Sequence, residues 1–282
     1  MSVRGQRRDA WGRRRHAGKH LLLGMLAVLM LFPLVLTVST AFKTEQDVRT
    51  NPFGLFSSFS WENVVTAWTV GRFGDYVLNS FLLTVPSTLL VVALSTMGGY
   101  AFARLPFRGR TVVFYIVIVG LLVPFTTYMI PLYFQLRSMR MLDSLLGTNL
   151  VLASTQLSFG TFFMRAFFTD LPGELAQAAR MDGASEWQIF SRIMLPLTAS
   201  GVSFLTVYTF LQTWNNFLVP LLYMPGGEYR PLTTGLYLFV SGRTLDIGPL
   251  AAGTLITILP VVLLFVVLQR QVTEGFSGAI KG

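Results

Sequence analysis

The chain has 282 residues, of which 52% are hydrophobic and only 12% are charged, and its formal net charge is +9. A soluble globular domain usually carries about twice this charged fraction, so the composition excludes an ordinary soluble domain and predicts an integral membrane protein. The chain has no cysteine, which excludes disulfides and thiolate metal sites, and its two histidines, His16 and His20, lack a second group of ligands and predict no metal site.

The first 19 residues are predicted to be a basic tail, because seven arginines and lysines precede the first apolar run. A basic cluster can bind nucleic acid, but before a membrane helix it is the typical cytoplasmic flank. The apolar run from Leu21 to Phe42 is too long for the core of a cleaved signal peptide. We therefore expect a cytoplasmic tail and no nucleic-acid partner.

Membrane spans are predicted wherever roughly 20 mostly apolar residues follow one another. The six stretches that qualify are 20–42, 77–103, 111–136, 145–168, 200–222 and 249–269. The loops and tails on one side of these spans hold 15 Lys and Arg residues, and those on the other side hold 7. Since the side richer in Lys and Arg is cytoplasmic, both termini are predicted to lie in the cytoplasm.

The sequence thus predicts an all-α integral membrane protein with six transmembrane helices and no separate soluble domain. Ser95, Gly99 and Ala103 in the second span recur every four positions, which lets another helix approach closely. The predicted organisation comprises a basic tail over 1–19, the first transmembrane helix and outer loop over 20–76, the transmembrane core over 77–270 and a cytoplasmic tail over 271–282.

The segment over 169–198, between the fourth and fifth spans, is predicted to form two short helices joined by a sharp turn. Asp170 is a favourable N-cap for the first helix, and Asp182-Gly183 is a turn signal that ends it. Ser185 and Gln188 have the spacing of a capping box at the start of the second helix. The predicted apolar positions are Leu175, Ala178 and Ala179 in the first helix and Trp187, Phe190, Met194 and Leu197 in the second. Such an amphipathic pair suits a connector on the membrane surface or a docking element.

The same segment resembles the motif of ATP-binding-cassette (ABC) importer permeases, E-A-A-x3-G-x9-I-x-L-P. Gln177-Ala178-Ala179 is followed at the motif's spacings by Gly183 and then by Ile193, Leu195 and Pro196. The resemblance implies the type I ABC importer permease fold, with a cytoplasmic coupling helix-turn-helix between helices 4 and 5 that docks on an ATPase. The residues it implies for this coupling are Glu174, Gln177, Ala178, Ala179, Asp182, Gly183, Ile193, Leu195 and Pro196.

The chain departs from that motif at Gln177, where the family pattern has glutamate. A hydrogen bond to a charged group contributes about 1.5–3 kcal/mol, against about 0.5–1.5 kcal/mol for a neutral one. Glu174 lies three residues earlier on the same helix face. We therefore hypothesise that Glu174 supplies the charge that Gln177 lacks.

Three flanking stretches are similar to maltose-type carbohydrate permeases: Asn79-Ser80, the run from Trp214 to Phe217, and the ending from Gly278 to Gly282. This resemblance implies a multi-pass protein of the bacterial plasma (inner) membrane. It also implies a second homologous permease, two ATPase subunits that carry ATP and Mg, and an extracytoplasmic solute-binding protein. The last outer loop, over 223–248, is expected to help engage that binding protein.

Polar side chains on the fifth span are candidates to line a pathway for the solute, because lipid cannot hydrogen-bond them. The candidate pathway-lining residues are Gln212, Thr213, Asn215 and Asn216. Hydrogen bonding between helices is the alternative explanation for polar residues in a span.

No phosphate-binding G-x-x-x-x-G-K-[S/T] loop and no nucleophile–base pair occurs in the sequence, so the chain is not predicted to be an enzyme or to carry a cofactor. We predict the permease subunit of an ATP-dependent carbohydrate importer. The alternatives are an ABC permease for glycerol phosphate, peptides or amino acids, or a stand-alone secondary transporter. Cargo choice depends on the binding protein and the partner permease, so this sequence leaves the solute open.

Overall fold

The computed structural model describes the backbone of residues 3–241 and 247–279, and its side chains over 19–237 and 247–267. The described residues are helices and turns, without strands. They divide into two compact units, one of residues 1–71 with 239–256, and one of residues 72–238 with 257–282. The two units are described in turn.

The first unit begins with α1 (Val3–Ala41), a helix that includes most of the stretch predicted as the basic tail. The most apolar 18-residue window of its part over Lys19–Ala41 has a mean hydropathy of 2.7 and contains no buried residue, whereas Ser39, Thr40 and Ala41 at the end of the helix are buried. Pro33 lies inside this helix, and the hydroxyl of Thr37 donates to the carbonyl of Pro33 at 2.8 Å. A helix this apolar and this exposed is suited to contact lipid or another membrane subunit.

Two short helices follow α1 in the first unit, α2 (Glu45–Thr50) and α3 (Glu62–Thr69). Lys43 is completely buried beneath them, and its ammonium donates to the carbonyls of Asn51 at 2.7 Å and Pro52 at 3.3 Å. These carbonyls end α2, where a positive charge is favoured. The hydroxyls of Ser57 and Ser58 donate to Asp47, which lowers the pKa of that carboxyl from its usual value.

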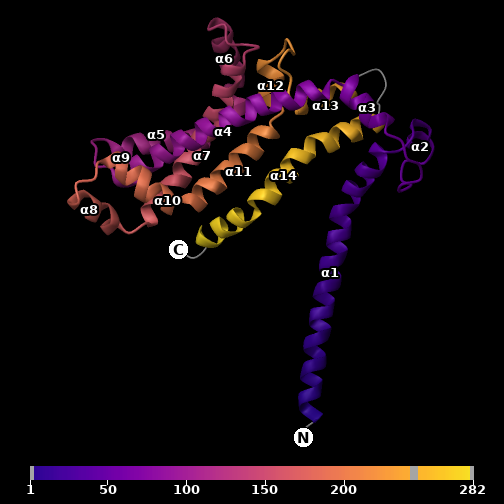
Figure 1. Cartoon of the computed structure of the whole chain (residues 1–282), viewed down its shortest axis with the longest axis horizontal. Coiled ribbons are helices and arrows are strands. Elements are labelled where there is room, and N and C mark those ends of the chain that lie inside the picture. Colours follow the sequence, from indigo (N-terminus) through magenta and orange to yellow (C-terminus); the bar gives the residue numbers. More distant parts are fainter. Residues whose placement is uncertain (1–2, 242–246, 280–282) are drawn as a thin grey trace. The chain divides into compact units, whose positions relative to one another are not determined.

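The second unit is built on α4 (Phe73–Arg104) and α7 (Leu145–Asp170), which lie side by side (Figure 1). The small residues predicted to allow this approach lie at the contact. A Cβ atom at Gly99 would lie 2.7 Å from Cβ of Met164, and Ser95 is completely buried. The predicted close packing of this span is therefore confirmed.

The prediction that residues 111–136 form a single spanning helix is wrong. The chain forms α5 (Arg110–Leu122) and α6 (Phe125–Ser138), which are bent by 100° relative to one another. Pro124 precedes α6 and Val123 before it is extended. Proline has no amide hydrogen to continue α5, and it disfavours the helical conformation in the residue before it.

The fifth predicted span, over 200–222, is also interrupted. α11 (Ala199–Trp214) ends before the break at residues 215–217, and α12 (Leu218–Tyr223) follows. On its other side α11 is bent by 77° from the helical run over 186–197. α13 (Leu232–Ser241) lies within the stretch predicted as the last outer loop, of which residues 242–246 are outside the described chain.

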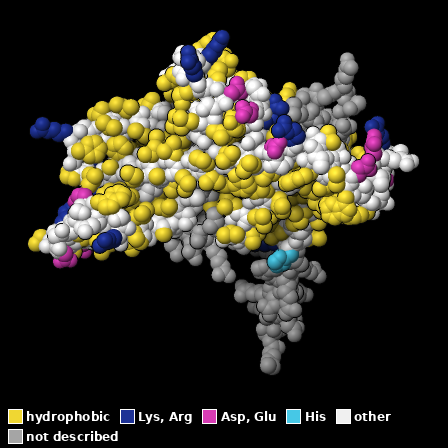
Figure 2. Space-filling view, turned by 45° about the horizontal axis from the view of Figure 1, so that its top comes forward, with side chains coloured by type: hydrophobic (Ala, Val, Ile, Leu, Met, Phe, Trp, Pro, Cys, Tyr) yellow, Lys and Arg dark blue, Asp and Glu magenta, His cyan; other side chains and the backbone are white. Residues whose placement is uncertain are grey.

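Within the described residues, three helical stretches are long and apolar enough to cross a membrane: Lys19–Ala41, Phe73–Arg104 and Ile247–Val267 of α14 (Ile247–Ala279). The described residues contain up to five spans if each of the two bent helix pairs, over 110–138 and over 186–214, counts as one span. Hydrophobic side chains cover much of the visible surface (Figure 2), as a protein in contact with lipid requires. The predicted total of six spans stays a prediction.

Candidate functional site

The segment over 169–198 lies at one end of the second unit and consists of short helices joined by turns (Figure 1). Pro172 occupies the N-cap position of α8 (Gly173–Met181) without a capping hydrogen bond from its side chain, while Asp170 still belongs to α7. The predicted N-cap at Asp170 is therefore wrong, since α7 extends two residues past the predicted end of the fourth span. The predicted turn is confirmed: α8 ends at Asp182, and Gly183 has a φ of +80°, which favours glycine.

The second helical part of this segment begins with the predicted capping box. The Ser185 hydroxyl accepts from the amide of Gln188, and the Gln188 side chain accepts from the amide of Ser185. The run then continues as α9 (Glu186–Gln188), the π-helix η1 (Ile189–Met194) and α10 (Leu195–Leu197).

The apolar face of this segment differs in part from the predicted one. Of the predicted apolar positions, Ala179, Phe190 and Met194 are buried within the chain, whereas Leu175 and Ala178 are exposed and Ala176 is buried. Trp187 and Leu197 are also exposed, whereas Ile189 is completely buried. In a π-helix, residues four and five apart share a face. A face predicted at the α-helical spacing therefore places its two outer residues, Trp187 and Leu197, wrongly. The buried cluster comprises Tyr100, Met164, Phe168, Ala176, Ala179, Ile189, Phe190, Met194 and Leu205.

A polar contact joins this segment to α4. The hydroxyl of Tyr100 donates to Oε2 of Glu186 at 3.1 Å, and Nε of Arg180 donates to Oε1 of the same carboxylate at 2.6 Å. The hydrogen bond to Glu186 raises the pKa of the Arg180 guanidinium. One carboxylate thus connects α4, α8 and α9.

Arg104 makes a second connection, from the end of α4 to the end of α7. Its guanidinium donates to the carbonyl of Phe168 at 2.8 Å and also to that of Leu171. These carbonyls lie at and just past the end of α7, where helical acceptors are left without intrahelical donors. The end of α4 is therefore fastened to the link between α7 and α8.

The residues predicted for coupling fall into two groups. Ala179 is buried, and Ile193 packs against the cluster beneath the segment. The exposed group consists of Glu174, Gln177, Ala178, Asp182, Gly183 and Pro196, while Leu195 is half-buried. Two large apolar side chains that the motif does not include are exposed beside them, Met181 at 88% and Trp187 at 63%. An apolar patch with a polar rim is typical of a docking surface.

The polar residues predicted to line a pathway have different environments. Thr213 is buried, and its hydroxyl accepts from the side-chain amide of Gln156 on α7 at 2.8 Å. Asn216 is half-buried and its side chain accepts from the amide of Val219 at 3.0 Å, at the start of α12. Thr213 therefore makes the contact between helices that was the alternative explanation, whereas the side chain of Asn216 makes a local contact at the start of α12. Gln212 and Asn215 are exposed.

The two flanking stretches near residues 79 and 214 have structural contacts that the sequence did not indicate. The side chain of Asn79 donates to the carbonyl of Arg230 at 3.1 Å, and the hydroxyl of Ser80 accepts from the amide of Leu232 at 2.9 Å. The indole of Trp214 is buried and donates to the carbonyl of Thr257 at 3.1 Å. These side chains hold the connection between α12 and α13 and the middle of α14. Residues 280–282 of the third stretch lie outside the described chain.

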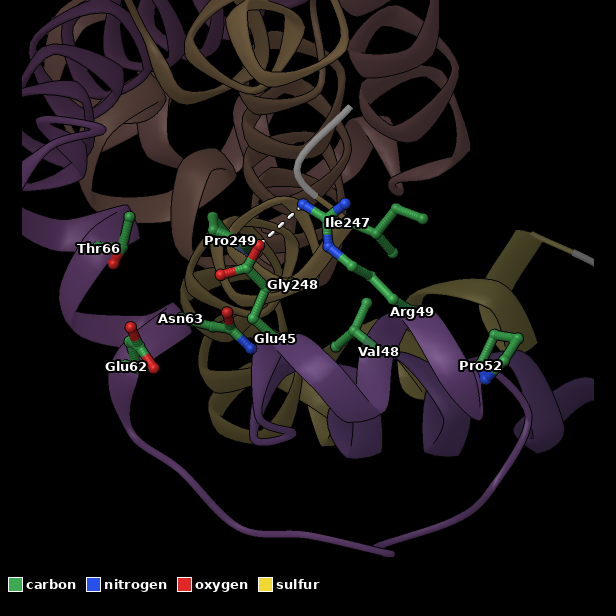
Figure 3. Close-up of a pocket in the computed structure, with 10 residues that line it drawn as sticks. All are labelled: Glu45, Val48, Arg49, Pro52, Glu62, Asn63, Thr66, Ile247, Gly248 and Pro249. Carbon is green, nitrogen blue, oxygen red and sulfur yellow. Dashed lines mark hydrogen bonds and ion pairs between the residues drawn. The ribbon is translucent and has the colours of Figure 1, made fainter. Parts of the chain in front are cut away.

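A pocket of about 660 Å³ lies within the first unit, between α2, α3 and the start of α14 (Figure 3). The carboxylate of Glu45 and the guanidinium of Arg49 form an exposed ion pair of 2.8 Å on one side of it. Asn63 also lines the pocket. Its side-chain amide donates to the carbonyl of Lys43 at 2.7 Å, and the side chain lies close to Gly248. The lining of the pocket is mixed, with apolar residues such as Val48, Pro52 and Ile247 beside the polar ones. The described residues contain no cluster of His, Cys, Asp or Glu that could hold a metal ion.

Comparisons with known proteins identify a family and individual proteins that are similar to this chain. The profile of the family described as "Binding-protein-dependent transport system inner membrane component" matches residues 95–274. The chain is 33% identical over 267 residues to the diacetylchitobiose uptake system permease protein NgcG of Streptomyces coelicolor, covering 94% of this chain and 88% of the relative. It is 31% identical over 264 residues to the arabinooligosaccharides transport system permease protein AraQ of Halalkalibacterium halodurans, covering 91% and 93%.

Among solved structures, a similar chain occurs in a bacterial ABC transporter involved in the import of the acidic polysaccharide alginate. The two chains superpose with a TM-score of 0.81 at 22% sequence identity, over 92% of this chain and 96% of the other. At this identity the likeness concerns the fold, and it confirms the predicted fold of an ABC importer permease.

Proposed function

The chain belongs to the family of binding-protein-dependent transport system inner membrane components, and from this premise we propose that it is the permease subunit of an ATP-dependent oligosaccharide importer. It is a multi-pass membrane protein, and its partners in this proposal are a second permease, two ATPases and a solute-binding protein outside the membrane. ATP and Mg bind to the ATPases, so the chain itself is a conduit and not an enzyme.

Coupling to the ATPases is assigned to the exposed side of α8 and the turn that follows it. The observation that carries this proposal is the exposed apolar surface of Met181 and Trp187 on a segment fastened to two long helices. A partner that binds these side chains buries apolar surface and moves the segment as a unit. The contacts of Tyr100 and Arg104 then pass the displacement to the ends of α4 and α7.

The orientation in this proposal has the 169–198 segment and both termini in the cytoplasm. The excess of Lys and Arg on this side of the spans supports it. The segment over 43–72 and the connection between α12 and α13 then lie outside, where the solute-binding protein is. The hydrogen bonds of Asn79 and Ser80 give that connection a fixed form, and preorganisation of this kind lowers the entropic cost of docking.

Oligosaccharides are proposed as the cargo because the two relatives described above are named for diacetylchitobiose and arabinooligosaccharides. On this chain Gln212 and Asn215 are the pathway candidates, since the rest of the chain leaves both side chains exposed. Thr213 and Asn216 are second to them, because Thr213 is buried and Asn216 is half-buried.

Purification from the native membrane in mild detergent tests the proposed assembly. Mass spectrometry of the proteins that co-purify with a tagged chain is expected to find an ATPase, a second permease and a solute-binding protein. The ligand retained by that binding protein then identifies the cargo. A chain that purifies alone and moves solute in vesicles without ATP would instead be a secondary transporter.

A further inference from the structure

An arginine near the end of α7 has no partner for part of its guanidinium. Cζ of Arg165 lies 4.1 Å from the centroid of the Phe114 ring on α5, a cation–π contact. Its Nε is buried and has no hydrogen-bond acceptor among the described residues. The ion pairs within the described part of the chain do not include Arg165. A buried charged donor without an acceptor is costly, so this position favours a ligand that accepts hydrogen bonds and carries negative charge.

The space beside this guanidinium is a small cavity of about 70 Å³. It is lined by Phe102, Arg110, Thr111, Phe114, Tyr115 and Arg165. Arg110 and Thr111 also line a larger open hollow of about 670 Å³ over residues 106–112. The lining of both spaces includes arginine side chains and hydroxyl groups but no acidic side chain.

The first turn of α5 adds a third source of positive potential. α5 has 13 residues, and its N-cap, Gly109, has no side chain that could accept from the first amides of the helix. The amides at the start of a helix have no intrahelical acceptor, and together with the helix dipole they favour an anion. Arg110 and Arg165 line one cavity beside the first turn of α5, so the position is suited to a phosphate group.

The surface of α5 beyond the cavity indicates a lipid phosphate. Its exposed apolar side chains recur at helical spacing from the first turn to the last: Val112, Ile116, Val119 and Leu122. At 1.5 Å per residue this stripe is about 15 Å long, roughly half the hydrocarbon thickness of a bilayer and hence the depth of one leaflet. Val112, the first residue of the stripe, lines the larger hollow together with Arg108 and Arg110.

We propose that Arg110, Arg165 and the first turn of α5 bind the phosphate of an anionic phospholipid whose acyl chain lies along the exposed stripe of α5. The bound lipid would join α5 to α7, because its phosphate contacts one arginine from each helix. The inference goes beyond the proposed function: it requires only that the chain is in a membrane, and it holds or fails independently of the cargo and the ATPase.

The experiment measures lipid binding to the purified transporter by native mass spectrometry. The probes are phosphatidylglycerol and phosphatidylcholine with identical acyl chains, and inorganic phosphate is added as a competitor. The wild-type protein is expected to retain phosphatidylglycerol in preference to phosphatidylcholine. Arg165→Met and Arg110→Met should each weaken this binding by on the order of fivefold, while Arg165→Lys should retain part of it.

The matched control is Arg137→Met, which removes an exposed arginine from the last turn of α6 and should leave lipid retention unchanged. Equal retention of the two lipids by the wild-type protein would overturn the proposal. So would unchanged binding in the Arg110→Met and Arg165→Met variants. Displacement of the bound phosphatidylglycerol by millimolar inorganic phosphate would assign the site to a free anion and overturn the proposal of a lipid ligand. Arg165→Lys keeps the test valid if Arg165→Met fails to assemble.

Discussion

The hydroxyl of Tyr100 on α4 lies 3.1 Å from the carboxylate of Glu186, which begins the second helical part of the 169–198 segment. The other oxygen of this carboxylate is held by Arg180 from the end of α8. A force applied to the exposed side of α8 therefore has a direct polar path to a long helix. Rigid elements joined by specific contacts can transmit such a displacement.

Tyr100→Phe removes this hydrogen bond and keeps the aromatic ring in the cluster. Because Glu186 is partly exposed, we expect a loss of about 0.5–1 kcal/mol in coupling free energy, or roughly twofold to fivefold. In proteoliposomes, solute uptake per ATP hydrolysed should fall while the ATPase stays bound. Tyr133→Phe on α6 is the control and should have no effect. Loss of ATPase binding in Tyr100→Phe would show that the contact serves docking instead of transmission.

Gly183→Ala tests the turn between α8 and α9. The substitution meets no atom within 4 Å, so its cost comes only from the φ of +80°, about 1–2 kcal/mol for a residue with a side chain. Relief of this strain should rotate α8 and reduce ATPase binding several-fold in a pull-down assay.

Gly109→Ala is matched to Gly183→Ala, since Gly109 has a φ of +79° and the same open surroundings. The two variants should lose similar stability, but Gly109→Ala should keep ATPase binding. Equal binding by both variants would contradict the assignment of the docking surface to this turn.

Glu174→Gln and Gln177→Glu test how the chain compensates for the missing glutamate of the family motif. Both side chains are exposed on α8. If Glu174 carries the docking charge, Glu174→Gln should weaken ATPase binding and Gln177→Glu should restore it in the double variant. A single charge-assisted contact at a partly exposed interface predicts a change of about 1 kcal/mol, or roughly fivefold in affinity. Titration of the ATPase onto the reconstituted permease measures it, and an unchanged affinity in Glu174→Gln would refute the hypothesis.

Gly99→Ala tests the close packing of α4 on α7. The added Cβ would lie 2.8 Å from the backbone nitrogen of Arg165, so the helices must separate. We expect a loss of about 1–3 kcal/mol of stability, the usual cost of overpacking. Gly98→Ala is the control, because its Cβ would meet Thr161 at an ordinary 3.5 Å. Thermal unfolding followed by tryptophan fluorescence compares the variants, and equal midpoints would contradict the packing described here.

Local chemistry made several features predictable from the sequence. The turn at Gly183 and the capping box of Ser185 and Gln188 depend on residues close in the chain, so their spacing sufficed to predict them. The packing of Gly99 was predictable because small residues at a four-residue spacing create a groove on any helix.

Other features depend on contacts that sequence spacing does not contain. The π-helix over Ile189–Met194 changes which residues share a face, so Trp187 is exposed and does not share the buried face of Phe190 and Met194, although the α-helical spacing predicted one face for all three. A proline inside a span often marks a bend, but the sequence did not show that the chain at Pro124 breaks into two helices bent by 100°, because the apolar run continues through it and its length favoured one span. The contacts of Asn79 and Ser80 join residues about 150 positions apart, a distance over which no pattern predicts a partner.

The most direct test of the proposed function is uptake into proteoliposomes that contain this chain with its co-purified partners. A labelled oligosaccharide and the solute-binding protein are supplied outside, and ATP or a non-hydrolysable analogue is enclosed. The account predicts uptake that requires both ATP and the binding protein and that stops when the ATPase is omitted. Uptake that proceeds at the same rate without ATP would contradict it.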